Sequence, residues 1–521
     1  MPTALYRLLL SLALLLPLGA QAGDALEFTR AGASEQVRLL EHWSASPTAE
    51  RRAFLDALRQ GRVGTDSDKN PHIQEAGQWQ PLTEANSDDT PRVLRLNNRL
   101  RGLLNTALAS HALGDEDAAV RLDAARTLQR NAPAALLPVL EQRFAQEDND
   151  AVHDALALAL ANLQLVSPEA ATRLKAVRLL GETGEPLART RLQSLLDGDE
   201  ADPAVRKAAQ TSLAQVERKL FFGELLGQAF SGLSLGSILL LAALGLAITF
   251  GLLGVINMAH GEMLMLGAYS TYLVQIGFQK LAPEYLALYP LAALPVAFLV
   301  TALIGMALER TVIRHLYGRP LETLLATWGI SLILIQLVRV IFGAQNVEVA
   351  NPAWLSGGWQ VLPNLVLPWN RIVIIGFALF VVALTWLLLN RTRLGLNVRA
   401  VTQNRNMAAC CGVPTGRVDM LAFGLGSGIA GLGGVALSQI GNVGPDLGQG
   451  YIIDSFLVVV LGGVGQLAGS ISAAFGLGVL NKILEPQIGA VLGKILILAL
   501  IILFIQKRPQ GLFALKGRVI D

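Results

Sequence analysis

Residues 228–252 read QAFSGLSLGSILLLAALGLAITFGL, an apolar run without Asp, Glu, Lys or Arg. A transmembrane helix needs about 20 such residues to cross the hydrocarbon core of a bilayer. The chain of 521 residues is 52% apolar and only 16% charged, with a mean hydropathy of +0.46. This composition is too apolar for an ordinary soluble protein of this length and indicates a membrane protein.

Further apolar segments predict an all-α, polytopic transmembrane bundle of about nine passes. Besides 228–252, these segments are 262–280, 286–308, 321–342, 371–390, 419–440, 451–464, 468–484 and 488–506. The segment 451–464 is short and leads into a glycine-rich stretch, which is typical of a half-helix that lines a cavity or packs inside protein. Small residues four apart, such as Gly424 and Gly428, predict close helix packing.

The charges of the connections orient this bundle. Basic residues gather at 310–319, at 391–417 and in the tail after Gln506, whereas the connection 344–370 has no Lys or Arg. The positive-inside rule places the first three on the cytoplasmic face and the last one outside. With a secreted N-terminus and a cytoplasmic tail, the number of passes is odd, and nine satisfies every connection.

The first residues predict a targeting segment. Arg7 precedes the apolar run Leu8–Leu18, and Ala20-Gln-Ala22 has the small-x-small pattern of a signal-peptidase site. We therefore expect a signal peptide over 1–22, an extracytoplasmic helical domain over 23–218 and a transmembrane domain over 219–521.

The expected N-terminal domain is rich in Ala, Leu and Arg with apolar residues at helical spacing. Similar helix starts recur, and Arg121 and His153 are 32 residues apart while Arg173 and Arg206 are 33 apart. This spacing predicts stacked helix pairs that resemble HEAT-type repeats. The stretch Asn70–Asp89 has no helical period and predicts a surface loop.

Several kinds of chemistry are disfavoured. The net charge of +2 and the dispersed charges argue against nucleic-acid binding. No catalytic motif, cofactor motif or metal-ligand spacing is present, so an interaction role is expected for the N-terminal domain. The adjacent Cys410 and Cys411 are expected to be small apolar fillers. His42, His72, His111 and His153 are isolated from one another and are expected to be ordinary histidines.

Three sequence stretches resemble the branched-chain amino acid type of ABC permeases. They are GLLGVINMAHGEMLMLGAY at 251–269, the loop with Gly395, Arg399, Ala400, Asn404, Ala408 and Gly412, and the ending RPQGLF at 508–513. Within that family, YGRPLETLLATWG at 317–329, NVEV at 346–349, WLSGG at 354–358 and the secreted extension look like the urea permease branch. The resemblance covers the chain from about residue 225 onward.

The resemblance implies a transport subunit, not an enzyme, that carries urea through the inner membrane. The partners that it implies are a second permease subunit in a heterodimer, two cytoplasmic ATPase subunits and an extracytoplasmic solute-binding protein. The chain itself has no GxxxxGK[ST] phosphate loop, because GAVLGKI at 489–495 has the wrong spacing and no hydroxyl for magnesium. Any ATP hydrolysis is therefore expected on another chain.

Polar residues within the apolar region are candidates for the translocation path, because such groups are costly at membrane depth unless they pair or face water. Urea offers one acceptor and several N–H donors, so a path needs donors and acceptors of its own. The candidates are Asn257, His260, Glu262, Glu322, Thr327, Trp328, Asp454 and Gln466. Capping of helix ends, or satisfaction of exposed backbone groups, is the structural alternative for each of them.

The loop 391–417 mixes basic and apolar residues and predicts an amphipathic helix that docks the ATPase; an ordinary positive-inside loop is the alternative. Import of branched-chain amino acids or short amides, a passive urea or amide channel, and a receptor with an external sensory domain are the competing functions. Only fifteen residues follow Gln506, which disfavours a receptor with a cytoplasmic output domain.

Overall fold

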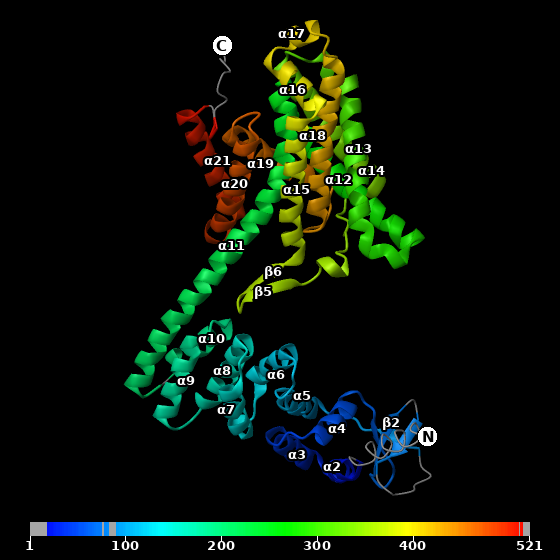
Figure 1. Cartoon of the computed structure of the whole chain (residues 1–521). Helices are drawn as coiled ribbons and strands as arrows, with labels where there is room; N and C mark the ends of the chain where they lie inside the picture. Colours follow the sequence, from blue (N-terminus) through cyan, green and yellow to red (C-terminus); the bar gives the residue numbers. More distant parts are fainter. Residues whose placement is uncertain (1–17, 76–77, 83–89, 199, 510, 514–521) are drawn as a thin grey trace, which may run out of the picture. The chain divides into compact units, whose positions relative to one another are not determined.

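The computed structural model describes residues 18–75, 78–82, 90–198, 200–509 and 511–513 (Figure 1). By its internal contacts the chain divides into two compact units, residues 1–222 and 223–521. Residues 8–17 of the apolar run in the predicted signal peptide lie outside the described residues. Helix α2 (Leu18–Arg30) contains the predicted cleavage motif.

The N-terminal unit is built mainly of short helices, several of which begin at a side chain that caps them. Thr48, Asn97, Asp117 and Asn149 each accept a backbone N–H at a helix start, which satisfies donors that the helix leaves free. After α2 the helices are α3 (Ala33–Ala45), α4 (Ala49–Arg59), α5 (Asn98–Ala112), α6 (Ala118–Asn131), η1 (Ala134–Leu136), α7 (Leu137–Gln146), α8 (Asp150–Gln164), α9 (Ala170–Glu182), α10 (Pro186–Asp197) and the start of α11 (Pro203–Leu253).

Aromatic packing organises the first part of this unit. The rings of Phe28, Trp43 and Phe54 lie 5.7–6.1 Å apart, centre to centre, in the buried core of α2–α5. Such tilted and edge-on pairs stabilise a core by more than the burial of their surface area alone.

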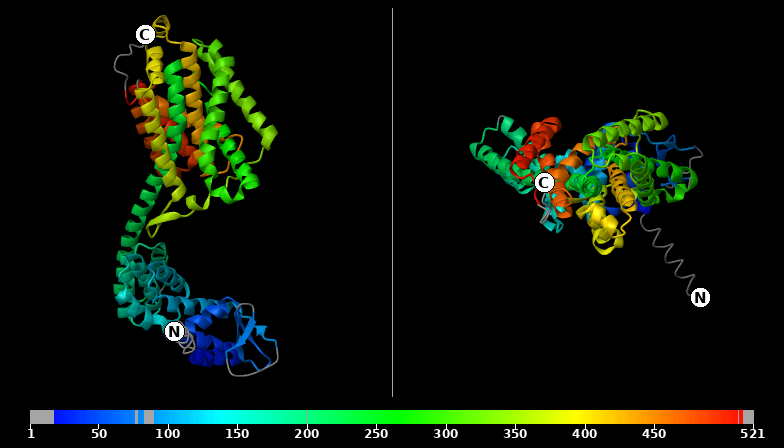
Figure 2. Two further views of the ribbon diagram at one scale, coloured as in Figure 1. Left: turned by 45° about the vertical axis from the view of Figure 1, so that its right-hand side comes forward. Right: turned by 90° about the horizontal axis from the view of Figure 1, so that it is seen from above.

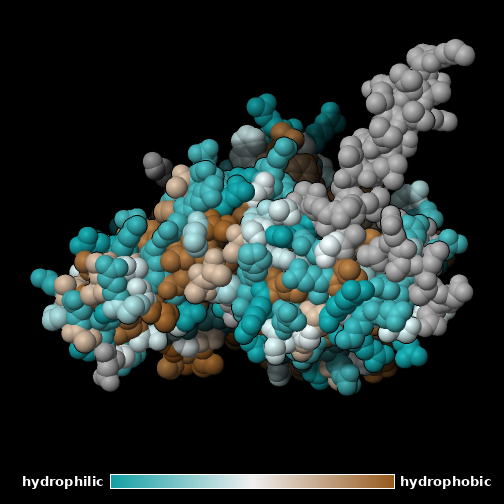
Figure 3. Space-filling model, turned by 90° about the horizontal axis from the view of Figure 1, so that it is seen from below, coloured by the Kyte–Doolittle hydropathy of each residue, from teal (hydrophilic) through white to brown (hydrophobic). Residues whose placement is uncertain are grey.

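The face of the molecule drawn in Figure 3 is mainly hydrophilic, with separate hydrophobic patches.

A four-stranded antiparallel sheet lies where the sequence predicts a surface loop. Its strands β1 (Val63–Thr65), β2 (Pro71–Glu75), β3 (Gln78–Pro81) and β4 (Arg92–Val93) are ordered β3-β2-β1-β4. The loop prediction for Asn70–Asp89 is therefore wrong at β2 and β3, while 76–77 and 83–89 lie outside the described residues. Asp66 makes the β1–β2 turn, because its Oδ1 accepts the N–H groups of Asp68 and Asn70.

The structure also shows which helices of this unit are equivalent. Arg121 in α6 forms a two-bond ion pair with Glu147, and Arg173 in α9 forms the same pair with Glu200. Each arginine also donates to the carbonyls of the two residues that lie six and five positions before it. Arg173, and not His153, thus occupies the position of Arg121. The assignment to HEAT-type repeats stays a prediction.

The C-terminal unit contains the long apolar helices (Figure 2). Its helices after α11 are α12 (His260–Leu281), η2 (Pro283–Leu288), α13 (Tyr289–Thr311), η3 (Ile313–His315), α14 (Pro320–Phe342), η4 (Ala353–Leu355), α15 (Trp369–Arg391), α16 (Arg393–Gln403), α17 (Arg405–Cys410), α18 (Thr415–Ser438), α19 (Leu447–Gly462), α20 (Leu467–Ile488) and α21 (Ala490–Lys507). A two-stranded hairpin, β5 (Gly358–Leu362) and β6 (Leu365–Pro368), precedes α15. The chain is thus mainly helical but not all-α.

Within the described ranges, seven helices are long and apolar enough to cross a membrane. They include α11, α13, α14, α15, α18, α20 and α21. Helix α19 has only 16 residues, in keeping with the short segment seen in the sequence, and α12 carries several polar residues. The count of nine passes stays a prediction.

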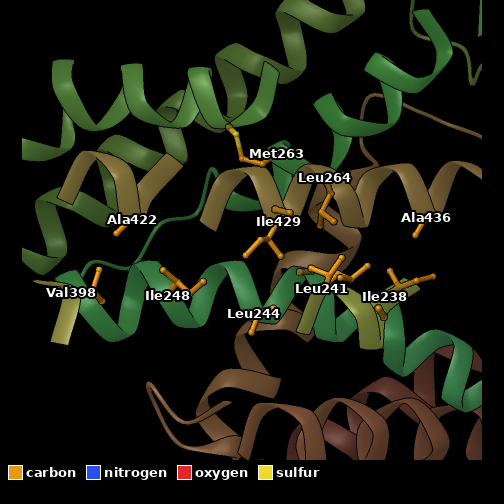
Figure 4. Close-up of a cluster of buried hydrophobic side chains, with 14 of the residues drawn as sticks. Ile238, Leu241, Leu244, Ile248, Met263, Leu264, Val398, Ala422, Ile429 and Ala436 are labelled. Atoms are coloured by element: carbon orange, nitrogen blue, oxygen red, sulfur yellow. The ribbon is translucent and has the colours of Figure 1, made fainter. Parts of the chain in front are cut away.

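Helix α18 is mostly buried and packs on α12 and α13, and glycines bring its backbone close to theirs. A Cβ atom on Gly267 of α12 would meet the backbone of Gly431, and one on Gly424 would meet Met306 of α13. The close packing predicted from the small residues is therefore present. Figure 4 shows the apolar side chains between α11, α12 and α18, including Leu241, Leu264 and Ile429.

Candidate functional site

The start of α12 holds a buried polar segment. The connection from α11 turns at Gly254, whose φ of +63° suits glycine, and leads into Asn257. The side chain of Asn257 is only 2% exposed, and its Oδ1 accepts the N–H of Ala259 at 3.1 Å. Its Nδ2 has no hydrogen-bond partner among the described residues. A buried donor without a partner is costly, so this amide is prepared for a further interaction.

Helix α14 presents a row of buried hydroxyl groups to this segment. Thr323, Thr327 and Ser331 are four residues apart, so they lie on one helix face, and all are buried. The Thr327 hydroxyl accepts the N–H of Met258 at 3.1 Å. Ser331 donates to Glu262 Oε1 at 2.9 Å. The other carboxyl oxygen of Glu262 is buried and finds no partner in the described part of the chain.

The structure thus brings together Asn257, Glu262 and Thr327, and adds Ser331, which the sequence analysis missed. Ser331 lies one helical turn after Thr327, and this spacing could have identified it. His260 belongs to a different contact: its Nε2 lies 3.0 Å from the carbonyl oxygen of Ala242 in α11. Residues two apart on a helix face different directions, so His260 and Glu262 point to different neighbours.

A small cavity of about 170 Å³ lies beside Asn257. Asn257 is its one polar side chain among apolar residues from α11, the 254–259 connection and α19, which are Leu246, Phe250, Ile256, Met258, Ile452, Ile453 and Phe456. An apolar cavity with few polar groups is typical of small-molecule sites. It can hold an aliphatic group while Asn257 bonds a polar one.

Four of the predicted path residues lie elsewhere. Glu322 is exposed and pairs with Arg319 at 3.1 Å, and the Trp328 side chain is exposed on the outer face of α14. Asp454 pairs with Lys494 of α21 at 3.2 Å. Gln466 lies at the α19–α20 turn. The structure therefore does not join these residues to Glu262 and Asn257.

Gln466 instead shares a pocket with the predicted ATPase-docking segment. This pocket, of about 360 Å³, is lined by the ends of α11 and α15, by α16 and by the α19–α20 turn. Arg399 lies in its wall together with Gln466 and Gln403. Arg399 also donates to the carbonyl of Leu389 at 2.8 Å and to Asn390 at 3.2 Å, so it caps the end of α15.

The other docking-segment residues have identifiable local roles. A Cβ atom on Gly395 would meet the backbone of Leu389, so only glycine fits where α16 folds back on α15. Asn404 caps α17 by accepting the N–H of Met407 at 2.9 Å, Ala408 is buried, and Gly412 ends the segment with a φ of +83°. Ala400 is half-buried. Contact with an ATPase stays a prediction for all of them.

The prediction for the two cysteines is wrong. Cys410 is the last residue of α17 and Cys411 is its C-cap, and both are exposed. They are not apolar fillers of the core.

These features define a class of protein: a polytopic helical membrane protein with buried polar groups inside its bundle. Residues 228–505 match the family model for the branched-chain amino acid transport system / permease component. The match covers more than half of the chain, and the chain belongs to this family.

Three relatives illustrate the relationship. The chain is 28% identical over 301 residues to the high-affinity branched-chain amino acid transport system permease protein LivH of Salmonella typhimurium, covering 57% of this chain and 96% of that protein. It is 29% identical over 293 residues to the corresponding protein BraD of Pseudomonas aeruginosa, with 55% and 95% covered. The autoinducer 2 import system permease protein LsrD of Yersinia enterocolitica is 30% identical over 184 residues, with 34% and 53% covered. No solved structure matches the chain.

Proposed function

We propose that this chain is the membrane-spanning permease subunit of an ATP-driven importer, with urea as its cargo. The observation that carries the proposal is a pair of buried atoms, Asn257 Nδ2 and Glu262 Oε2, that have no hydrogen-bond partner among the described residues. His260 Nδ1, between them in the chain, has none there either, but its ring is directed to Ala242 of α11. Asn257 Nδ2 is a donor and Glu262 Oε2 is an acceptor. Urea has one carbonyl acceptor and four N–H donors, so it complements both.

The two unpartnered atoms are energetically costly to bury. A buried polar atom without a hydrogen bond costs about 1–3 kcal/mol, and a passing solute that supplies the missing partner recovers part of that cost. Thr327 and Ser331 hold the two ends of the segment from α14, so both atoms have fixed neighbours. A fixed set of polar groups discriminates between solutes better than a flexible one.

Import of a branched-chain amino acid is the second candidate, and a specific observation favours it. The cavity beside Asn257 is otherwise apolar and suits an aliphatic side chain, which urea lacks. The names of LivH and BraD also refer to branched-chain amino acids. The resemblance of 317–329, 346–349 and 354–358 to the urea branch supports urea.

The proposed assembly follows from the same reasoning. The N-terminal domain, residues 23–218, lies in the periplasm, and the transmembrane domain, 219–521, crosses the inner membrane nine times. Its segment 391–417 faces the cytoplasm and docks two ATPase subunits. A second permease subunit completes the path, and a solute-binding protein delivers the cargo. The basic residues of 391–417 and the absence of a phosphate loop from the sequence support this arrangement.

Uptake in a strain that lacks the gene tests cargo and path together. The strain is complemented with the wild type, with Glu262→Gln or with Glu284→Gln, which makes the same change at an exposed carboxylate that forms no ion pair with any described residue. Labelled urea, leucine and acetamide are supplied separately. We expect wild-type and Glu284→Gln cells to accumulate urea and Glu262→Gln cells to lose most uptake. Accumulation of leucine alone would establish the second candidate, and equal uptake by all three strains would contradict the path.

A further inference from the structure

A buried ionic cluster lies at the end of the C-terminal unit that carries α16 and α17 (Figure 1). Arg405, the first residue of α17, forms an ion pair with Asp419 of α18. Its guanidinium carbon also lies 4.8 Å from the ring centre of Tyr317, within the range of a cation–π contact. The Tyr317 hydroxyl donates to Glu309 Oε1 at 2.9 Å.

The cluster joins four separate elements. Glu309 lies near the end of α13, Tyr317 in the connection to α14, Arg405 at the start of α17 and Asp419 in the first turns of α18. The side chain of Asp419 is fully buried and Glu309 is 2% exposed, whereas that of Arg405 is 42% exposed. A guanidinium at the surface thus reaches inward to a buried carboxylate.

Burial makes this arrangement sensitive to the position of Arg405. Asp419 Oδ1 and Glu309 Oε2 are buried and lack hydrogen-bond partners among the residues described. Removal of one partner from a buried ion pair is much more costly than loss of a surface pair, because the remaining charge stays unpaired. Movement of α17 away from α18 would therefore be opposed, and movement of α17 together with α13 and α18 would be favoured.

The cluster is also continuous with the polar segment at the start of α12. Tyr317 packs on a small apolar cluster formed by Val255, Ile313 and Phe423. Val255 lies two residues before Asn257, in the same connection. Contacts therefore run from Arg405 through Tyr317 to the segment that carries the unpartnered amide, and energetic coupling is carried by such contiguous contacts.

We propose that Arg405 is a positioning residue that links movement of α17 to α13, α18 and the 254–259 connection, and so couples ATP hydrolysis to solute movement. The inference rests on the proposed function as an ATP-driven permease. Arg405 acts through Asp419 and Tyr317 and does not touch solute. A static brace is the alternative, in which loss of Arg405 lowers stability but leaves the solute moved per ATP unchanged.

The test uses the complete transporter in proteoliposomes, and the measured quantity is the ratio of cargo imported to ATP hydrolysed. The variants are Arg405→Gln, Asp419→Asn and the double variant. Arg508→Gln is the matched control, because Arg508 is exposed, lies outside the docking segment 391–417 and forms no ion pair within the described part of the chain. We expect each single variant to assemble with the ATPases and to lower the ratio by about 5- to 150-fold. The double variant should be no worse than the poorer single one, because both remove the same pair.

A ratio equal to that of the wild type in Arg405→Gln, with lower thermal stability, would establish the static brace and overturn the inference. If Arg405→Gln fails to assemble, Tyr317→Leu decides, since it removes the ring that lies against the guanidinium and leaves the ion pair of Arg405 with Asp419 in place. A lower ratio in Tyr317→Leu supports the inference, and an unchanged ratio contradicts it. A complete wild-type transporter that hydrolyses ATP but imports none of the tested solutes would instead contradict the proposed function.

Discussion

Replacement of Gly267 by alanine tests the packing that holds the candidate site. Gly267 faces Gly431, and a Cβ atom there would lie 2.7 Å from the Cα atom of Gly431, well inside the 3.4–4 Å of an ordinary van der Waals contact. Helix α18 has little room to retreat, because a Cβ atom on Gly431 would itself lie 2.8 Å from the methyl group of Thr301 in α13. Helices α12 and α18 must therefore separate by several tenths of an ångström.

The expected cost follows from these contacts. Overpacking of this kind destabilises by about 1–3 kcal/mol. Alanine recovers up to about 1 kcal/mol through its better helix propensity. Gly267→Ala should therefore lower thermal stability in detergent, with earlier aggregation on heating.

Gly277→Ala is the matched control in the same helix. No atom lies within 4 Å of a Cβ built on Gly277, so only the gain in helix propensity applies, and its stability should equal or exceed that of the wild type. The assay is the loss of monodisperse protein with temperature for the three proteins side by side. If Gly267→Ala and Gly277→Ala behave alike, the close approach of α12 and α18 is not as described.

Three further predictions concern separate parts of the chain. Ser331→Ala removes the hydrogen bond to Glu262, and the loss of roughly 1–3 kcal/mol of interaction energy should lower solute uptake by about 5- to 150-fold. Ser331→Thr keeps the hydroxyl group and should retain most of the uptake, which is measured for both variants. The hydrogen bond from Arg121 lowers the pKa of Glu147, so the pair stabilises the N-terminal unit above about pH 4.3, and this stability is lost as the pH falls through the lowered pKa. Hydrogen exchange at α6–α7 in the full chain should therefore become faster at acidic pH, and Glu147→Gln should abolish this pH dependence. The exposed thiols at 410–411 should react with an impermeant reagent only after cells are permeabilised, and labelling of intact cells would reverse the proposed orientation.

The sequence predicts the long helices well because length and apolarity determine which segments can span a membrane. It fails for β2 and β3, which are only five and four residues long, since short strands show no distinct periodicity. The turn from β1 into β2 also depends on the Asp66 side chain. It also does not show that Arg121 and Arg173 are equivalent. Their partners Glu147 and Glu200 lie 26 and 27 residues further along the chain, in the connections that follow α7 and α10, and a local pattern does not show such contacts.

The candidate site is predicted in part for a related reason. Asn257 and Glu262 stand out as polar residues in an apolar stretch. The side of a helix that they face is not evident, because a membrane helix is apolar all round and lacks the polar face that orients a soluble helix. Trp328 follows Thr327 directly, yet only Thr327 faces the α12 segment. The cluster around Arg405 combines residues more than a hundred positions apart in the sequence, and only the fold brings them together.

The most direct test of the central claim is uptake by proteoliposomes that contain this chain, a partner permease, two ATPase subunits and the solute-binding protein. Labelled urea and leucine are supplied with ATP, without ATP and with a non-hydrolysable analogue. The account predicts accumulation of one cargo above its external concentration with ATP alone. Equilibration of urea at the same rate in all three conditions would contradict it and would identify a passive channel.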